Sequence, residues 1–455
     1  MKKLAAEKSA GESNPSTLFL ELLLLTLLTL CCRLPFFFES VIDWDESTFI
    51  LIGQSILDGH LPYTQLWDIK PPFAYGFFSL AILLFGKMIA SVRFAGALVV
   101  ALTAFVVNRI TQRLWTIRSG WLAGVLMILI TSVLKDGQAV MSEHLAVLPL
   151  VLALYVLVAR GITTATLFFT ALLISTAAMV RLNLAYVVVG VGLYLLALGL
   201  KQPLAKQIRS GLAYSLGGVI PVFVSIVPYW MAGIPQVWWN SVVVAALSRA
   251  DSNLESYEVA WDLLGDVLVS FWSVSGFGLQ VLFWGGAIAG TRLMFNQSAK
   301  MQPSQKLSWA LVIVFLLTVL FSILSSGSGH SHYLFQIVPF LVILSGVFAD
   351  TVISRGRRAI ALLSLILCLG LYPVFKQYAV VLPRALTGSP LDQSPARQIA
   401  DYFTDNGLAD RSIYFMRQHI VHWYLGTYPL IPSIAHPSTI GKDYLLQALY
   451  GPDWS

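Results

Sequence analysis

The stretch that decides the fold is LFLELLLLTLLTLCCRLPFFFESVIDWDE, residues 18–46, in which a long apolar run meets a cluster of acids. A helix of about 20 predominantly apolar residues spans a hydrocarbon core of about 30 Å, and residues 18–38 suffice for this. Asp43, Asp45 and Glu46 follow directly, around Trp44. The stretch therefore predicts a retained membrane anchor that leads into a polar site at the far membrane surface.

The rest of the chain repeats the apolar pattern. Of 455 residues, 57% are hydrophobic, against roughly 45–50% in soluble domains, and mean hydropathy is +0.75. We therefore expect an all-α polytopic membrane protein. The expected spans after residues 18–38 lie at about 89–108, 119–135, 143–160, 162–180, 182–200, 211–231, 264–290, 307–325, 332–350 and 357–376, about eleven in all.

Charged residues between the spans predict the orientation. Lys2, Lys3 and Lys8 precede the first span, which places the N-terminus in the cytoplasm. The loops on that side then receive most of the basic residues, and the outer loops receive most of the acidic ones. We assign the net charge of +6 to these cytoplasmic loops and not to a nucleic-acid partner.

Domain boundaries follow from this topology. Residues 1–16 form a cytoplasmic tail and residues 17–376 the transmembrane domain, with outer loops at 39–88 and 232–263. Within the first loop, Phe73–Phe85 is short and is expected to lie along the membrane interface. Residues 377–455 read as a small soluble α/β region on the outer side, with a helix after Ser394-Pro395 and a strand at Ile413–Met416.

Ionisable side chains close to hydrocarbon are costly, so each is a candidate for function. The topology gathers the candidates at the outer ends of the spans. Carboxylates together with Lys, Arg and His suit a phosphate-bearing substrate and a hydroxyl that loses its proton. The candidate site residues are Asp45, Glu46, Lys70, Arg93, Glu143, His144, Arg181, His330, His332 and Tyr333.

Structural explanations compete with these functional ones. Asp43 and Glu46 have the spacing of a helix capping box, which leaves Asp45 unexplained. Lys70 before two prolines, and equally Arg93, could simply extend toward the membrane surface.

The candidates farther along the chain also have ordinary explanations. Glu143 suits the first turn of a helix, and Arg181 lies at a helix end, where extension toward the surface is common. His330 and His332 follow glycines in a loop, where histidines are usually solvated. No zinc-binding pattern such as His-Glu-x-x-His is present, so no metal ligand is assigned and a divalent cation stays open.

Several short motifs, taken in order, resemble integral-membrane glycosyltransferases of the GT-C superfamily, especially the dolichyl-phosphate-mannose protein mannosyltransferases and the lipid A aminoarabinose transferases. The resemblance covers most of residues 17–350. The motifs are Asp45-Glu46, Gly59-His60-Leu61-Pro62-Tyr63, Asp68-Ile69-Lys70-Pro71-Pro72, Val92-Arg93-Phe94-Ala95-Gly96, Ser142-Glu143-His144, Met179-Val180-Arg181 and His332-Tyr333-Leu334.

The resemblance implies transfer of a hexose or pentose from a polyprenyl-phosphate donor, with inversion at the anomeric carbon. It implies Asp45 as general base with Glu46 assisting, and a donor-phosphate contact by Lys70. Arg181 stands where relatives have a basic residue, and Glu143 where they have an acidic residue that positions substrate. The chain departs from the pattern in having His144 next to Glu143, which loosens that assignment.

The same resemblance implies a setting for the reaction. The protein would be integral to the cell or inner membrane, with its active site and C-terminal region on the outer, periplasmic side. Its partners would be the lipid-linked donor, the bilayer, and a lipid, polysaccharide or protein acceptor.

Two other function classes remain open at this point. A secondary transporter would also be polytopic, but it usually has repeat symmetry and ionisable groups at mid-depth. A non-catalytic membrane scaffold with an outer docking region is the second alternative.

Overall fold

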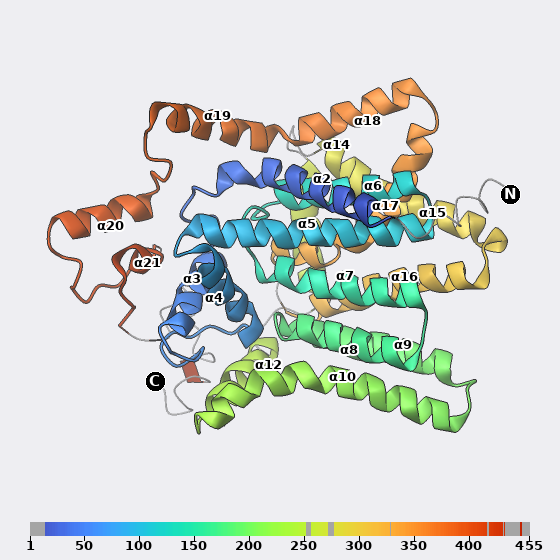
Figure 1. Ribbon diagram of the computed structural model, residues 1–455, viewed down its shortest axis with the longest axis horizontal. Helices are drawn as coiled ribbons and strands as arrows, with labels where there is room; N and C mark the ends of the chain where they lie inside the picture. The colour runs from blue at the N-terminus through green and yellow to red at the C-terminus, as the bar shows by residue number, and fades with distance from the viewer. Residues whose placement is uncertain are drawn as a thin grey trace.

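The computed structural model describes residues 14–251, 256–271, 277–327, 329–415, 418–430, 432 and 446–447. Within these residues every regular element is a helix (Figure 1). This is the all-α membrane architecture that the repeated apolar segments predict, because helices satisfy their own backbone hydrogen bonds inside lipid.

Long helices form the body of the molecule. They are α2 Pro15–Arg33, α5 Ile89–Leu114, α6 Ile117–Val133, α7 Ser142–Arg160, α8 Thr164–Ala178, α9 Ala185–Gly199, α10 Leu204–Met231, α15 Gly286–Gln297, α16 Pro303–Leu324 and α17 Val338–Ile353.

Other elements lie around them. These are α3 Trp44–Leu57, α4 Pro72–Phe85, α11 Pro235–Trp238, α12 Ala245–Asp251, α13 Ser256–Phe271, α14 Phe277–Gln280, α18 Arg357–Gly370, α19 Tyr372–Thr387, α20 Pro395–Asp405 and α21 Val421–Leu425. Short 3-10 and π turns complete them: η1 Leu34–Phe36, η2 Leu182–Leu184, η3 Trp239–Val244, η4 Val281–Gly285, η5 Ser298–Lys300 and η6 Ser331–Gln336.

The long helices pack side by side, both with neighbours in sequence and with helices far away along the chain. One row runs α10, α8, α7, α5 and α2, and a second connects α5 through α6 and α17 to α15. Small residues allow two of these contacts to be very close. A Cβ on Gly217 of α10 would lie 2.2 Å from Phe168 O of α8, and one on Gly290 of α15 would lie 2.0 Å from Leu344 O of α17.

The lengths of the helices show which of the expected spans are long enough to cross a membrane. Six described helical stretches are long and apolar enough to cross a membrane: Pro15–Phe36, α5, α7, Leu182–Gly199, α10 and α16. A seventh is the pair α18 and α19, bent by 48° at their junction, and α4, α6, α8 and α17 are shorter apolar helices. The expected total of about eleven spans stays a prediction.

The span expected at 264–290 has different bounds. Its first part belongs to α13, which begins earlier at Ser256, and its second part belongs to the run from α14 through η4 to α15, residues 277–297. Hydropathy averaged over this region does not separate the two helices. Asp262 and Asp266, four residues apart on α13, show that α13 carries a polar stripe and is not an ordinary span.

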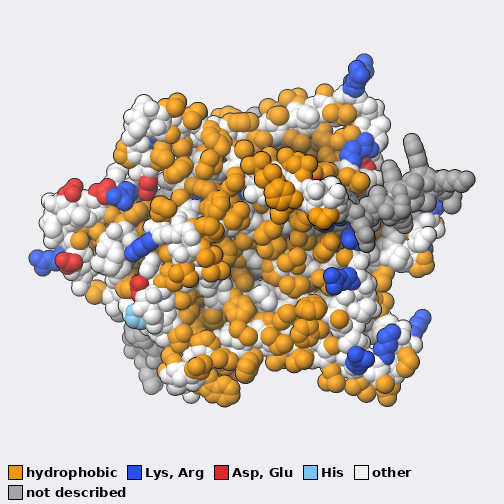
Figure 2. Space-filling model, viewed as in Figure 1, with side chains coloured by type: hydrophobic (Ala, Val, Ile, Leu, Met, Phe, Trp, Pro, Cys, Tyr) orange, Lys and Arg blue, Asp and Glu red, His pale blue; other side chains and the backbone are white. Residues whose placement is uncertain are grey.

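The surface divides by chemistry. Figure 2 shows a broad hydrophobic band across the middle of the molecule, with most visible Lys and Arg side chains at the end opposite α3 and α20. Exposed residues of α10, such as Leu212, Leu216 and Phe223, belong to the lipid-facing surface. Most of the basic side chains in this view therefore lie at one end of the molecule, as the predicted topology requires. Which end faces the cytoplasm stays a prediction.

Residues 39–88, predicted as the first outer loop, contain two short helices, as expected. At 14 residues each, α3 and α4 are about 21 Å long, too short to cross a core of about 30 Å. They pack against each other, with Phe49 of α3 in edge contact with Tyr75 and Phe78 of α4 at 5.8 and 5.4 Å. The packed helices α3 and α4 support the polar residues of this loop.

The C-terminal region differs from the expectation. Its α/β character is not confirmed: described residues beyond α19 form α20, α21 and coil, without a strand. Residues 413–415 of the expected strand are irregular, and Met416 lies outside the described residues. Phe415 instead packs its ring on Phe403 of α20 and His422 of α21, at 5.5 and 5.1 Å, so side-chain packing takes the place of strand pairing.

This region also packs on the first outer loop. His419 Nε2 lies 3.0 Å from the Thr48 hydroxyl of α3, and Trp67 N–H donates to Pro432 O at 3.0 Å. Tyr428 donates to Asp58 at the end of α3. The C-terminal residues thus cover the outer side of α3.

Candidate functional site

The N-terminus of α3 places Asp45. Asp43 is the N-cap, and its Oδ1 accepts the Asp45 N–H at 2.8 Å, which confirms the expected cap. Glu46 does not complete a capping box, because its carboxylate has other partners. Asp45 Oδ2 lies 3.1 Å from Lys70 Nζ, and these side chains are 16% and 11% exposed. The pair is therefore enclosed and still reachable from solvent.

Buried tyrosines hold the segment that carries Lys70. Tyr63 donates its hydroxyl to Lys70 O at 2.5 Å, and Lys70 N–H donates to the Tyr75 hydroxyl at 3.1 Å. Tyr75 in turn donates to Asp68 at 3.1 Å. Pro72 then begins α4, where the missing N–H of proline has no cost. The Asp-Ile-Lys-Pro-Pro motif is thus a rigid support for one ammonium group.

Electrostatics keep Lys70 charged. Burial by itself would lower the Lys70 pKa, but the charges of Asp45 and Asp68 outweigh it, so the pKa is raised above its usual value. The ammonium also lies 5.7 Å from the centre of the Phe49 ring. A cation with these surroundings can meet an anionic ligand without losing its proton.

A second ion pair comes from elements far away in sequence. Glu143, in the first turn of α7, lies 2.5 Å from Arg181, which follows the end of α8. Ser142 connects them, accepting from Arg181 at 3.0 Å and donating to Glu143 at 3.1 Å. The Arg181 guanidinium lies 3.9 Å from the centre of the Tyr333 ring. This pair is almost completely buried, at 5% and 0% exposure.

His330, His332 and Tyr333 are next to this second pair. His332 Nε2 lies 3.6 Å from Glu143 Oε1, and the His330 and His332 rings stack at 5.4 Å. Burial lowers the pKa of His332 to about 4, despite the opposing charges of Glu143 and Asp45. His332 is therefore neutral at pH 7 and offers hydrogen bonds, not charge.

The two ion pairs lie within electrostatic reach of each other. The Asp45 charge acts on the His332 pKa, and the Arg181 charge opposes the raised pKa of Lys70. The fold thus brings together six of the ten sequence-predicted residues, with His330 beside them. The six are Asp45, Lys70, Glu143, Arg181, His332 and Tyr333.

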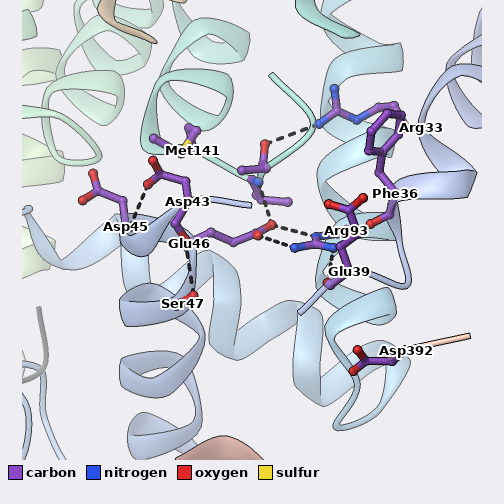
Figure 3. A network of polar contacts seen from close by, with 12 residues as sticks. Arg33, Phe36, Glu39, Asp43, Asp45, Glu46, Ser47, Arg93, Met141 and Asp392 are labelled. Atoms are coloured by element: carbon purple, nitrogen blue, oxygen red, sulfur yellow. Dashed lines mark hydrogen bonds and ion pairs between the residues drawn. The ribbon is translucent and has the colours of Figure 1, made fainter. Parts of the chain in front are cut away.

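Glu46 and Arg93 lie behind Asp45, away from solvent. Their side chains are 0% and 1% exposed and share a two-pronged contact, with oxygen–nitrogen distances of 3.1 and 2.6 Å (Figure 3). His144 is also buried: its Nδ1 accepts from Met141 N–H at 3.4 Å and its ring packs on Phe335 at 4.6 Å. These three predicted residues have protein partners where a substrate contact was expected.

Further acids surround the first pair. Burial and the neighbouring Asp45 charge raise the pKa of Asp43 to about 7, although the Asp45 N–H hydrogen bond opposes this. Burial also raises the pKa of Asp136 in the loop before α7. Two carboxyl groups near Asp45 therefore hold their protons to a higher pH than they would in water.

Asn183, a polar residue that the sequence did not single out, lies next to the second pair. Asn183 Nδ2 donates to Gln336 Oε1 at 3.0 Å and to Ser322 Oγ at 2.6 Å. Asn183 is two residues after Arg181, and Gln336 is in the same turn as His332. An amide within an apolar run near a candidate arginine was the available signal.

A divalent cation does not fit the described side chains well. Across the described ranges, no three His, Cys, Asp or Glu residues gather closely enough to hold a metal ion. Asp45, Glu46 and Glu143 each face a cationic side chain instead.

No family model and no curated protein sequence matches this chain. Solved structures do match. ArnT from Cupriavidus metallidurans in the apo state aligns with a TM-score of 0.59 over 91% of this chain and 86% of ArnT, at 15% identity. ArnT bound to undecaprenyl phosphate gives 0.57, over 91% and 85%, at 15% identity.

The apo oligosaccharyltransferase of Archaeoglobus fulgidus gives a TM-score of 0.53 over 93% of this chain and 61% of that protein, at 12% identity. Both ArnT and this oligosaccharyltransferase belong to the GT-C superfamily. The chain therefore has the GT-C fold, as the sequence motifs predicted.

Proposed function

We propose that this protein is a membrane glycosyltransferase that moves a sugar from a polyprenyl-phosphate donor to an acceptor hydroxyl, with inversion. The observation that carries the proposal is the Asp45–Lys70 pair, 3.1 Å apart and partly open to solvent, on the first outer loop of a GT-C fold. A carboxylate next to a charged ammonium combines a proton acceptor with a phosphate-binding cation.

Asp45 is the general base in this proposal. Inversion requires the acceptor oxygen to attack the anomeric carbon from the face opposite the leaving phosphate. The acceptor O–H bond breaks toward Asp45, the new glycosidic bond forms, and the bond to phosphate oxygen breaks with its electron pair. After the step Asp45 is a neutral carboxylic acid and the donor has become polyprenyl phosphate. Protons and charge therefore balance.

Lys70 and Arg181 stabilise the leaving phosphate. Both are cations held in place before substrate arrives, Lys70 by its loop and Arg181 by Glu143, Ser142 and Tyr333. Donors fixed in advance toward developing negative charge contribute a few kcal/mol each to a transition state. His332, neutral at pH 7, and Tyr333 supply hydrogen-bonding groups for the sugar.

A lipid-linked donor suits the position of the site. The polar pairs come from α3, the loop before α4, the first turn of α7 and the end of α8, at the α3 end of an apolar bundle (Figure 1). A polyprenyl tail can therefore stay in the bilayer while its sugar reaches Asp45. The similar ArnT structure is bound to undecaprenyl phosphate, which supports a donor of this class. We assign the site to the outer, periplasmic face because the basic loops gather at the opposite end.

The test uses purified protein in nanodiscs with a panel of polyprenyl-phosphate sugars. Wild type should hydrolyse one donor slowly without acceptor and transfer its sugar when acceptor lipids, polysaccharides or peptides are added. Asp45→Asn should bind that donor and fail to transfer. Asp401→Asn, which alters an exposed ion pair on α20, is the control and should keep full activity. An Asp45→Asn protein with near-normal transfer would refute the assignment.

A further inference from the structure

The carboxylate next to the proposed base has an unusually complete set of partners. Glu46 Oε1 accepts from Arg93 Nε at 3.1 Å and from the Val140 N–H at 2.8 Å, while Oε2 accepts from Arg93 Nη2 at 2.6 Å. The side chain is 0% exposed. Glu46 therefore cannot touch a substrate without leaving these partners.

Arg93 extends the same network to the end of the first long helix. Its Nη1 donates to Phe36 O at 2.6 Å and also to Glu39 O, both in the segment between α2 and α3 (Figure 3). One guanidinium thus joins α5, α3 and the turn after α2. We call Glu46, Arg93 and the backbone groups of Phe36, Glu39 and Val140 the Glu46–Arg93 junction.

The junction connects the two halves of the candidate site. Glu46 follows Asp45 directly on α3, and Val140 lies three residues before Glu143 in the segment that leads into α7. The same Glu46 carboxylate, on α3, accepts from Arg93 of α5 and from the Val140 N–H before α7. A shift of α3 relative to the start of α7 would have to break the Glu46–Val140 bond.

We infer that Glu46 and Arg93 are positioning residues that set the distance between Asp45–Lys70 and Glu143–Arg181. This inference rests on the proposed function. Transfer needs the base and the two phosphate-binding cations in one geometry, and an error of about 1 Å in such an arrangement can cost about 100-fold in rate. Neither junction side chain handles a proton or a phosphate itself.

The same contacts argue against other roles for Glu46 and Arg93. A residue that assists proton transfer has to reach the reacting atoms, and Glu46 is enclosed on all sides. An arginine that extends toward the membrane surface has an exposed head group, and Arg93 is 1% exposed. A pair that only adds stability would not need backbone contacts to both the α2–α3 and the α6–α7 segments.

The test must separate positioning from folding. Removing one partner leaves a buried charge unpaired and can unfold the protein, whereas replacing both with uncharged residues of similar volume is often neutral. The variant is therefore Glu46→Gln combined with Arg93→Met. The control, Glu21→Gln with Arg109→Met, removes a similarly buried pair near the other end of α5, with side-chain exposures of 7% and 11%.

The first measurement is steady-state transfer per folded molecule. The junction variant should lose about 10- to 100-fold in kcat, with a smaller rise in donor KM, because the lipid contacts persist while the two phosphate-binding cations are no longer held at one distance. The control pair should keep wild-type kcat. An unchanged kcat in a folded junction variant overturns the inference.

The second measurement does not depend on activity. Spin labels at Leu57, the exposed last residue of α3, and Arg160, the exposed last residue of α7, report the placement of one helix relative to the other. In a background without Cys31, Cys32 and Cys368, the distance distribution should broaden or shift in the junction variant and stay unchanged in the control. An unchanged distribution overturns the inference even if the wild type transfers no sugar and the proposed function fails.

Discussion

Asp45 and Glu46 are consecutive carboxylates in the first turn of α3, and their surroundings differ in almost every respect. Asp45 is 16% exposed and pairs with one lysine from a loop, whereas Glu46 is 0% exposed and accepts three hydrogen bonds from α5 and the segment before α7. Adjacent helix residues point about 100° apart, so the two face different environments. An Asp-Glu motif can therefore combine one reacting group and one structural group.

The largest expected effect comes from the exposed member of the two. Asp45→Asn removes the proposed base and should lower transfer by about 10²- to 10⁴-fold. Stability should fall less than on removal of one partner of the buried Glu46–Arg93 pair, because the Asp45–Lys70 pair keeps some contact with solvent. Parallel assays of transfer and thermal unfolding check both values. Loss of fold equal to the loss of activity would contradict a catalytic role.

The buried pair should show the reverse pattern when one partner is removed. Arg93→Met alone leaves the Glu46 charge unpaired inside the protein, which should cost about 3–5 kcal/mol of stability. Chemical denaturation in detergent micelles, or the yield of folded protein, measures this. If Arg93→Met is as stable as wild type, the Glu46 charge is compensated in some other way.

The pH dependence of stability sharpens the comparison, because titrating groups surround Asp45. Burial lowers the pKa of His332 to about 4, so between pH 4 and its ordinary value near 6.5 the unfolded chain binds a proton that the folded chain does not. This contribution makes stability rise with pH in that window and be lost as pH falls through it, on the order of 3 kcal/mol at most.

Asp43 acts in the opposite direction. Burial and the Asp45 charge raise its pKa to about 7, so its contribution to stability is present at low pH and is lost as pH rises toward 7. His332→Gln should therefore give a protein whose stability falls from pH 4 to 7. Asp43→Asn, which keeps the helix cap, should give one whose stability rises over pH 4 to 6.5. Thermal unfolding at half-unit pH steps would reveal the two slopes, and equal slopes in both variants would contradict this account.

The smallest expected stability effect is at the partner of Asp45. Lys70→Met leaves a carboxylate that is still reachable by water, so the cost should be smaller than that of removing one partner of the Glu46–Arg93 pair. Its effect on donor binding should be larger, with donor KM raised about tenfold through loss of one phosphate contact. Lys70→Arg should recover part of that binding. A donor KM equal to wild type in Lys70→Met would remove Lys70 from the phosphate site.

Particular elements show how far sequence reasoning reached. Asp43 was identified as a helix cap, and the N-cap contact to Asp45 N–H confirms it. The strand expected at Ile413–Met416 did not appear, because strand formation needs a neighbouring strand and local composition cannot supply one. The span expected at 264–290 merged parts of two helices, since an average of hydropathy does not locate a break.

The sequence predicted which residues belong to the candidate site, but not which of them pair with one another. Polar groups at the outer ends of apolar runs are rare enough to be noticed one by one. Their pairing was not visible: Asp45 meets Lys70 25 residues away, and Glu46 meets Arg93 47 residues away. Asn183 was missed because an amide next to an apolar run is not exceptional.

The sequence by itself determined that this chain is a helical membrane protein with basic loops at one end and acidic ones at the other. Those properties follow from the local composition of each segment, because lipid excludes unpaired backbone and charge wherever they occur along the chain. Only the tertiary structure decided which carboxylate faces solvent and which is enclosed. That choice depends on how α3, α5 and α7 pack against one another, and packing joins residues that have no fixed relation in sequence.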